Sequence, residues 1–131
     1  MPTWTEQNIR KNIPALPDLQ TIEIQEVEAG RVVYGFTPPA TLANYHGNMH
    51  GGLVYTLCEI AAGMVGSSLD KDNVALNGSI NYVRRCPLEQ PLTVTGTTSH
   101  NGRSTIVVHV SVTAEDKLIA EATYTLFVLS E

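Results

Sequence analysis

One segment of this chain, residues 51–68, carries apolar residues at helical spacing over five turns. Residues three and four positions apart share one face of a helix, and the apolar face here would be Leu53, Leu57, Ile60, Ala61, Met64 and Val65. The other face would carry Gly52, Tyr55, Thr56, Glu59, Gly63 and Gly66. An interior glycine costs about 1 kcal/mol relative to alanine, so Gly63 and Gly66 need a packing reason. Close approach of another backbone is the simplest one.

Most of the remaining chain shows the alternation typical of β-strands. The predicted strands are 22–27, 32–36, 74–82, 92–100, 106–112 and 118–129. Asn101-Gly102 is a strong hairpin signal, and Glu115-Asp116-Lys117 turns the chain into the last strand. Segment 74–82 is expected to be half-buried. One long helix with five to six strands predicts an α+β fold whose antiparallel sheet curls around the helix to bury it.

Length and composition limit the classes of protein that fit. The 131 residues are expected to form one domain, and a net charge of −5 argues against broad nucleic-acid binding. The first residues lack a signal-peptide core, and the helical run is too short and too mixed for a membrane span, so a cytoplasmic protein is expected. Cys58 and Cys86 are expected to be free thiols. Residues 4–13 predict a short amphipathic helix ended by Pro14 and Pro17.

The stretch NYHGNMHGG, residues 44–52, leads directly into the long helix. The first turn of a helix has unpaired backbone N–H groups and a partial positive charge. Because Gly51 and Gly52 have no Cβ, a ligand oxygen can reach those N–H groups, which is the geometry that stabilises an oxyanion. The plainer alternative is that the two glycines only end a loop.

Glu59 is the only charged residue between Gly51 and Leu69. A buried carboxylate without a partner tends to have a raised pKa, which suits a general base, and a desolvated carboxylate also suits a nucleophile. The alternative is that Glu59 faces solvent. Gly51 and Glu59 are about 12 Å apart along a helix, so one carbonyl carbon cannot contact both in one chain. If both act on one bond, a two-fold dimer with shared sites follows.

Other chemistries fit this stretch poorly. His46 and His50 have the i, i+4 spacing of a zinc helix, but they precede the helix, and no metal site is expected. Cys58 sits beside the apolar face, which disfavours a nucleophilic role. The chain has no Gly-x-Ser-x-Gly nucleophile elbow and no P-loop.

The block Asn44-x-x-Gly47-x-x-His50-Gly51-Gly52, followed by Glu59, resembles the hot-dog-fold thioesterases. The branch it resembles most is the PaaI-type acyl-CoA thioesterases of phenylacetate and hydroxybenzoate metabolism. The resemblance covers roughly residues 20–130 and implies a single hot-dog domain over 1–131, with 1–17 as an N-terminal extension. It also implies a homodimer with shared active sites, or a homotetramer built from two such dimers, with an acyl-CoA substrate and no cofactor.

The resemblance further implies roles for the residues of the block. Asn44 would hold the thioester or orient the attacking water, and the backbone N–H of Gly51, with Gly52 as a second candidate, would polarise the carbonyl. Glu59 of the partner chain would be the nucleophile or the general base. His50 would be a supporting, positioning residue rather than the base.

The resemblance also implies a coenzyme A site along the subunit edge, with basic residues at the phosphates. The residues at the corresponding places are Tyr82, Arg84 and Arg85 after one strand, and Arg103 and Ser104 in the predicted hairpin. Arginine suits phosphate oxygens through its bidentate geometry. The alternative is that these arginines only keep the strand ends soluble.

Two departures from the family pattern bear on activity. The acidic residue is Glu59, where the PaaI branch more often has Asp. Ala75 stands where the strand after the helix often carries Ser or Thr. Without that hydroxyl, either the attacking water is positioned less well or Ser79 and neighbouring side chains substitute for it. Hydrolysis of a small aromatic or fatty acyl-CoA is the first functional hypothesis, and a non-catalytic acyl-CoA or acyl-carrier-protein binding module is the second. A hot-dog dehydratase is disfavoured because the helix of Glu59 lacks a His.

Overall fold

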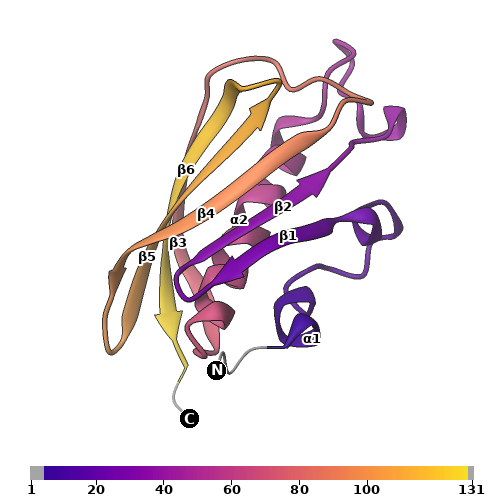
Figure 1. Ribbon diagram of the computed structural model, residues 1–131. Coiled ribbons are helices and arrows are strands. Elements are labelled where there is room, and N and C mark those ends of the chain that lie inside the picture. The colour runs from indigo at the N-terminus through magenta and orange to yellow at the C-terminus, as the bar shows by residue number, and fades with distance from the viewer. Residues whose placement is uncertain (1–4, 130–131) are drawn as a thin grey trace.

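The computed structural model describes residues 5–129, and over that range one long helix lies against a six-stranded antiparallel sheet (Figure 1). The helix is α2 (Gly51–Ser68). The strands are β1 (Glu23–Glu28), β2 (Arg31–Phe36), β3 (Asn73–Tyr82), β4 (Leu92–Asn101), β5 (Thr105–Ala114) and β6 (Lys117–Val128), in the spatial order β1-β2-β4-β5-β6-β3. The predicted fold class is confirmed.

The core forms between α2 and the concave face of the sheet. Leu57, Met64 and Val65 of α2 are fully buried, as are alternate residues of β5 such as Val108 and Val112. This pairing of a helical stripe with one face of a strand is what the two sequence periodicities predict. Figure 1 shows the sheet curving around α2, so that residues from most strands contact the one helix.

The two turns of the β4–β5–β6 meander differ in their chemistry. The β4–β5 hairpin forms at Asn101-Gly102 as predicted, but Gly102 has a negative φ and its N–H donates to Thr105 O, 2.8 Å away. Its loop therefore runs over residues 102–104 rather than over a two-residue Asn-Gly turn. The β5–β6 turn has positive φ at Glu115 (51°) and Asp116 (63°), as a type I′ turn requires.

Strand β3 lies at one edge of the sheet and pairs only with β6 in the part of the chain that the structure describes. Its alternation is interrupted by a bulge between Ala75 and Asn77. Val74 is 47% exposed and Leu76 is 60% exposed, so the prediction of a half-buried strand is wrong for the isolated chain. The free edge and the bulge together account for the exposed apolar side chains.

The N-terminal segment packs closely against the fold. The predicted helix is present as α1 (Glu6–Arg10), with Thr5 as its N-cap, and Trp4 lies outside the described residues. Ile9 is fully buried, and the Arg10 guanidinium donates to Ile22 O at 2.9 Å. A 3₁₀ helix, Pro17–Thr21, then leads into β1.

The interior glycines of α2 have neighbours within their own chain. A Cβ at Gly63 would lie 2.6 Å from Asn12 Oδ1, and one at Gly66 would overlap the side-chain amide of Asn73. The expectation that these glycines admit another backbone is therefore wrong, because two asparagine side chains fill the space.

No helix among residues 5–129 combines the length and hydrophobicity needed to cross a membrane.

Candidate functional site

The start of α2 opens into a surface depression of about 540 Å³. It is bounded by the loop before the helix and by the segment after β3. Its lining residues are Asn44, His46, Asn48, Met49, Gly51, Val54, Tyr82, Val83, Arg84, Arg85, Cys86 and Ile119. The structure thus brings together five of the residues predicted for the site: Asn44, Gly51, Tyr82, Arg84 and Arg85.

The hydrogen bonds at the start of α2 distinguish Gly51 from Gly52. His50 is the N-cap, and its Nδ1 accepts the Gly52 N–H at 3.2 Å. His50 O accepts the N–H groups of Leu53 (3.0 Å) and Val54 (3.1 Å). Among the described residues, the Gly51 N–H has no acceptor, so it is the N–H available to a ligand. Two bonds to the carbonyl of the same peptide also polarise that N–H.

This arrangement bears on two residues of the predicted block. The Gly52 N–H is already bonded, which leaves Gly51 as the better candidate for an oxyanion donor. His50 has the geometry of a capping residue, in keeping with the supporting role expected of it.

Asn44 shapes the loop that precedes the helix. Its side-chain oxygen accepts the N–H groups of His46 (3.0 Å) and Asn48 (3.1 Å), and its own N–H donates to Asn48 O at 2.7 Å. Gly47 completes this tight loop with a φ of 84°. Because Oδ1 is engaged, Asn44 can act on a ligand only through its side-chain N–H donors.

Two side-chain hydrogen bonds hold the end of β3 and the segment after it, and the first of them reaches the helix start. The Tyr82 hydroxyl donates to Gly51 O at 2.8 Å. Arg84 Nη1 donates to Leu118 O at 2.8 Å, which holds the Arg84 side chain along the start of β6. Burial raises the pKa of Tyr82, with smaller contributions from Cys58 and Tyr55, so the phenol remains a hydrogen-bond donor at neutral pH.

Glu59 lies in a different depression of about 440 Å³. The lining residues are Lys11, Asn12, Pro14, Thr56, Glu59, Ile60, Gly63, Asn73, Val74, Ala75 and Leu126. No residue is shared with the depression at Gly51, in agreement with the separation worked out from helix geometry.

The Glu59 side chain is exposed in the single chain, so the expectation of a buried carboxylate is wrong for one chain alone. It lies in a depression between the residues that follow α1 and the Asn73 end of β3. Lys11 and Asn12, which line the same depression, were missed from the sequence, because nothing in residues 10–14 links them to a helix 45 residues away.

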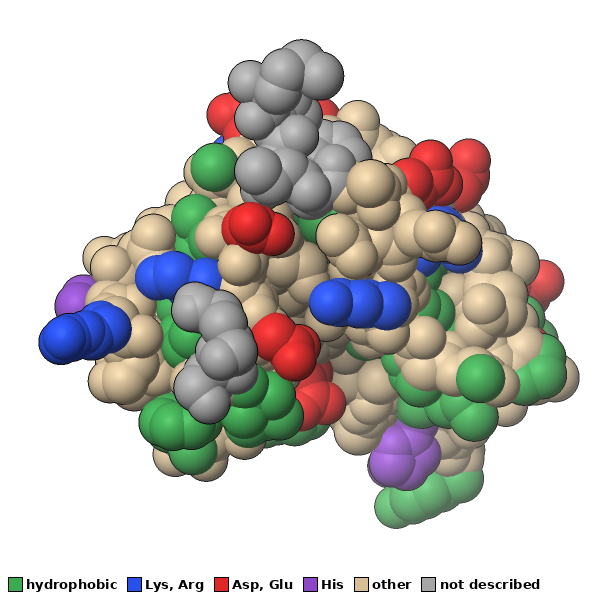
Figure 2. Space-filling view, turned by 90° about the horizontal axis from the view of Figure 1, so that it is seen from below, with side chains coloured by type: hydrophobic (Ala, Val, Ile, Leu, Met, Phe, Trp, Pro, Cys, Tyr) green, Lys and Arg blue, Asp and Glu red, His purple; other side chains and the backbone are tan. Residues whose placement is uncertain are grey.

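Arg103 and Ser104 lie in a third depression, with Asp70, Lys71, Asp72, Val128 and Leu129. They are therefore not grouped with Tyr82, Arg84 and Arg85 in one chain. The Lys71 ammonium donates to Asn101 Oδ1 (2.7 Å) and Gly102 O (2.9 Å), and it fixes the loop that carries Arg103. Figure 2 shows acidic and basic side chains interspersed on the face seen from below.

The two cysteines are buried thiols. Burial, with a smaller contribution from Cys86, raises the pKa of Cys58 to about 12, and burial raises the pKa of Cys86 to about 11. The Cys86 Sγ lies 3.8 Å from Met49 Sδ. Neither thiol is a reactive thiolate at neutral pH.

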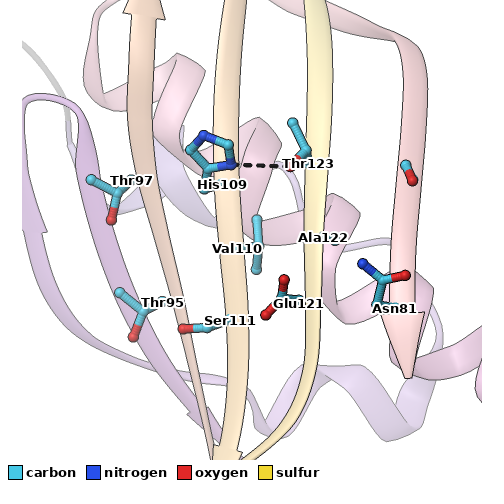
Figure 3. Close-up of a pocket in the computed structure, with 10 residues that line it drawn as sticks. Asn81, Thr95, Thr97, His109, Val110, Ser111, Glu121, Ala122 and Thr123 are labelled. Atoms are coloured by element: carbon cyan, nitrogen blue, oxygen red, sulfur yellow. Dashed lines mark hydrogen bonds between the residues drawn. The ribbon is translucent and has the colours of Figure 1, made fainter. Parts of the chain in front are cut away.

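A further shallow depression lies on the face of the sheet that is turned away from α2 (Figure 3). Hydroxyl and amide side chains line it, and a hydrogen bond of 3.0 Å joins His109 Nδ1 and Thr123 Oγ1. Ser79 belongs to this outer face, so it does not replace the hydroxyl that Ala75 lacks beside Glu59.

Within residues 5–129, no group of three or more His, Cys, Asp or Glu side chains is arranged to hold a metal ion. The candidate residues lie in two separate depressions, one at the N-terminus of α2 and one at the Glu59 carboxylate. A curved antiparallel sheet wrapped around one central helix places the protein in the hot-dog class.

Comparisons with known proteins agree with this class. The family model described as "Thioesterase superfamily" matches residues 46–121. No curated protein matches the chain. A hypothetical thioesterase from Streptococcus pneumoniae TIGR4, solved with coenzyme A, is 37% identical over 86% of this chain and 91% of its own, with a TM-score of 0.82.

Two other solved structures are similar over most of their length. The smu.793 protein from Streptococcus mutans UA159, bound to acetyl CoA, is 34% identical over 90% of this chain and 96% of its own, with a TM-score of 0.83. The E. coli PaaI protein is 24% identical over 93% of each chain, with a TM-score of 0.84, and shows the shared fold. The chain belongs to the thioesterase superfamily, which confirms the predicted family.

Proposed function

We propose that the protein is an acyl-CoA thioesterase that hydrolyses a small aromatic or fatty acyl-CoA to the free acid and coenzyme A. The observation that carries this proposal is the Gly51 N–H, which points from the start of α2 without an acceptor in the described chain. A helix N-terminus with a free N–H stabilises the oxyanion that forms when a thioester carbonyl is attacked.

The attacking side of the site requires a second chain. Among residues 5–129, β3 is an edge strand with Val74 and Leu76 exposed and no charged side chain, which favours antiparallel pairing with β3 of another copy about a two-fold axis. Such pairing sets residues 73–75 of one chain beside Tyr82 of the partner chain. Residues 73–75 line the Glu59 depression and Tyr82 lines the Gly51 depression, so the two depressions would adjoin across the dimer.

The same pairing would bring the two groups of residues proposed for coenzyme A to one side of the dimer. Val128 pairs with Asn73, so Arg103 and Ser104 lie toward the Asn73 end of β3, whereas Arg84 and Arg85 follow its other end. In an antiparallel dimer, Arg103 of one chain would therefore lie on the same side as the partner chain's Arg84 and Arg85. The coenzyme A of the two Streptococcus relatives supports this class of ligand. The homotetramer stays a prediction.

Glu59 would act in one of two ways on the partner chain's substrate. As a general base, its carboxylate takes a proton from water while the water oxygen bonds to the thioester carbon. As a nucleophile, a carboxylate oxygen bonds to that carbon, and water then hydrolyses the resulting anhydride. In both routes the C–S bond breaks as the oxyanion collapses, and coenzyme A leaves as a thiolate that takes up a proton.

The test is release of free thiol from a panel of aryl- and fatty-acyl-CoAs by the wild type and by Glu59→Ala and Glu59→Gln. We expect release by the wild type and a loss of at least a hundredfold in kcat for both variants, with coenzyme A binding retained. Lys117→Gln, a surface change at the start of β6, is the control and should keep full turnover. A Glu59 variant with wild-type turnover would remove this residue from the mechanism.

A second candidate function is a non-catalytic acyl-CoA or acyl-carrier-protein binding module, and Ala75 is the observation that favours it. Ala75 lines the Glu59 depression but carries no hydroxyl. In the S. pneumoniae relative, the aspartate and the threonine replaced in two variant structures stand 16 positions apart, the same spacing as Glu59 and Ala75. Binding of coenzyme A without hydrolysis of any substrate, and turnover gained by Ala75→Thr, would favour this function for the natural chain.

A further inference from the structure

Tyr82 contacts Gly51 through both its ring and its hydroxyl. The hydroxyl donates to Gly51 O at 2.8 Å. A Cβ built on Gly51 would lie 3.4–3.5 Å from three atoms of the Tyr82 side chain, which places the phenol directly against the Gly51 backbone. The ring therefore limits movement of Gly51 on one side while the hydroxyl fixes the direction of its carbonyl.

This contact acts on the least constrained part of α2. Two successive glycines form its first turn, and glycine has the largest conformational freedom of any residue. The peptide that carries the Gly51 N–H is held at its carbonyl, because His50 O accepts the N–H groups of Leu53 and Val54, and the His50 ring accepts the N–H of the next peptide. An oxyanion donor is effective only when its direction is set before the reaction begins. The rotation that remains is at the Gly51 Cα, which links these two peptides, and Tyr82 of β3 restrains it by packing on Gly51 and bonding its carbonyl.

We propose that Tyr82 is a positioning residue that holds the Gly51 N–H in the direction required to stabilise the oxyanion, rather than a contact of coenzyme A. This inference rests on the proposed thioesterase function. Tyr82 comes from the last position of β3, so it links the edge strand to the start of the helix across 31 residues of sequence. Its hydroxyl proton is already donated to Gly51 O and is not free for a phosphate oxygen.

The two roles predict different kinetics. Loss of a coenzyme A contact weakens substrate binding and raises KM with kcat unchanged. Loss of a restraint on the oxyanion donor affects the transition state, and it lowers kcat with little change in KM. The change that separates them is Tyr82→Phe, which keeps the ring against Gly51 and removes only the hydroxyl. Tyr82 is 53% exposed, so this variant should fold.

The experiment measures kcat and KM of Tyr82→Phe with the best acyl-CoA found for the wild type, beside Tyr45→Phe as the control. Tyr45 is 93% exposed in the neighbouring loop, and its hydroxyl donates to no group among residues 5–129. We expect kcat of Tyr82→Phe to fall about three- to tenfold, the range expected for one lost hydrogen bond, with KM unchanged. The control should match the wild type.

Amide hydrogen exchange provides a readout that needs no activity. The N–H groups of Leu53, Val54 and Tyr55 should exchange faster in Tyr82→Phe than in the wild type, while those of residues 60–65 should not change. Faster exchange together with lower kcat supports the inference. A raised KM with kcat intact, or no change in either measurement, overturns it. If the wild type hydrolyses no acyl-CoA, the proposed function fails and this role fails with it, whereas unchanged exchange in an active enzyme refutes the positioning role alone.

Discussion

Replacing Gly51 by proline deletes the one backbone N–H on which the proposed chemistry depends. Proline is well tolerated at the first position of a helix, where its missing N–H has no intrahelical partner. His50, the preceding residue, has φ −58° and ψ 132°, which is the extended conformation that a residue before proline favours. The substitution therefore removes the donor and leaves the local backbone conformation in place.

The expected loss follows from the role of the donor. Removing one oxyanion donor typically lowers kcat by about 10²- to 10³-fold, or about 2.7–4 kcal/mol of transition-state stabilisation. Gly51→Ala is the matched variant, because it adds a Cβ at 3.4 Å from the Tyr82 ring and keeps the N–H. We expect Gly51→Ala to lie within about threefold of the wild type, since 3.4 Å is close to ordinary van der Waals contact and alanine favours a helix.

The assay compares kcat for thiol release by the two variants and checks their thermal unfolding midpoints. A large loss in Gly51→Pro with a wild-type midpoint, beside an active Gly51→Ala, would identify the N–H as the donor. The reasoning is refuted if Gly51→Pro retains kcat within about tenfold of Gly51→Ala at equal stability.

Three other perturbations test the site and the core. Mixing Gly51→Pro and Glu59→Ala chains and allowing subunit exchange should restore about a quarter of wild-type turnover. Half of the dimers would contain one chain of each kind, and each of these would hold one intact site. No recovery would mean that each chain builds its own site. Tyr34→Phe should lower the free energy of unfolding in urea by about 1–2 kcal/mol, because the fully buried Tyr34 hydroxyl donates to Leu57 O; an unchanged urea midpoint would contradict this. Burial raises the pKa of Cys58 to about 12, so the folded chain holds this proton more tightly than the unfolded chain does. The resulting contribution to the free energy of unfolding is fully present below about pH 9 and is lost as the pH rises from about 9 to 12. In that range, the free energy of unfolding of the wild type should fall by up to about 1.4 kcal/mol per pH unit, and that of Cys58→Ala should fall less steeply. Equal slopes for the two proteins would show that Cys58 does not cause the pH dependence.

The sequence predicted those features that depend on one chain's own periodicity. The bounds of α2 agree with the predicted 51–68, because apolar residues at helical spacing mark this segment locally. The hairpin at Asn101-Gly102 was also predictable, but its register was not, since the bond between Gly102 N–H and Thr105 O depends on how β4 and β5 align.

Features that depend on distant neighbours were not predictable. The sequence could not decide whether Glu59 is buried. A helix face that is exposed in one chain can have the same pattern of apolar residues as a face that is buried in the core. Gly63 and Gly66 accommodate Asn12 and Asn73, which lie on opposite sides of α2 in the sequence. Lys71 had no pattern to identify it, since a single lysine in a turn after a helix is common. Long-range contacts of this kind can be identified only in the folded chain.

The β3 strand, described above as an edge strand, also bears on how the proposed dimer would form. Its sequence NVALNGSINY contains no charged residue and no proline, the residues that usually protect an edge strand from unwanted pairing. A newly made chain therefore exposes a ten-residue edge, which the proposed dimer would cover. We expect soluble yield to depend on how fast chains meet. Leu76 is already 60% exposed, and Leu76→Lys should prevent both unwanted pairing at β3 and dimer formation. We expect this variant to be a soluble but inactive monomer.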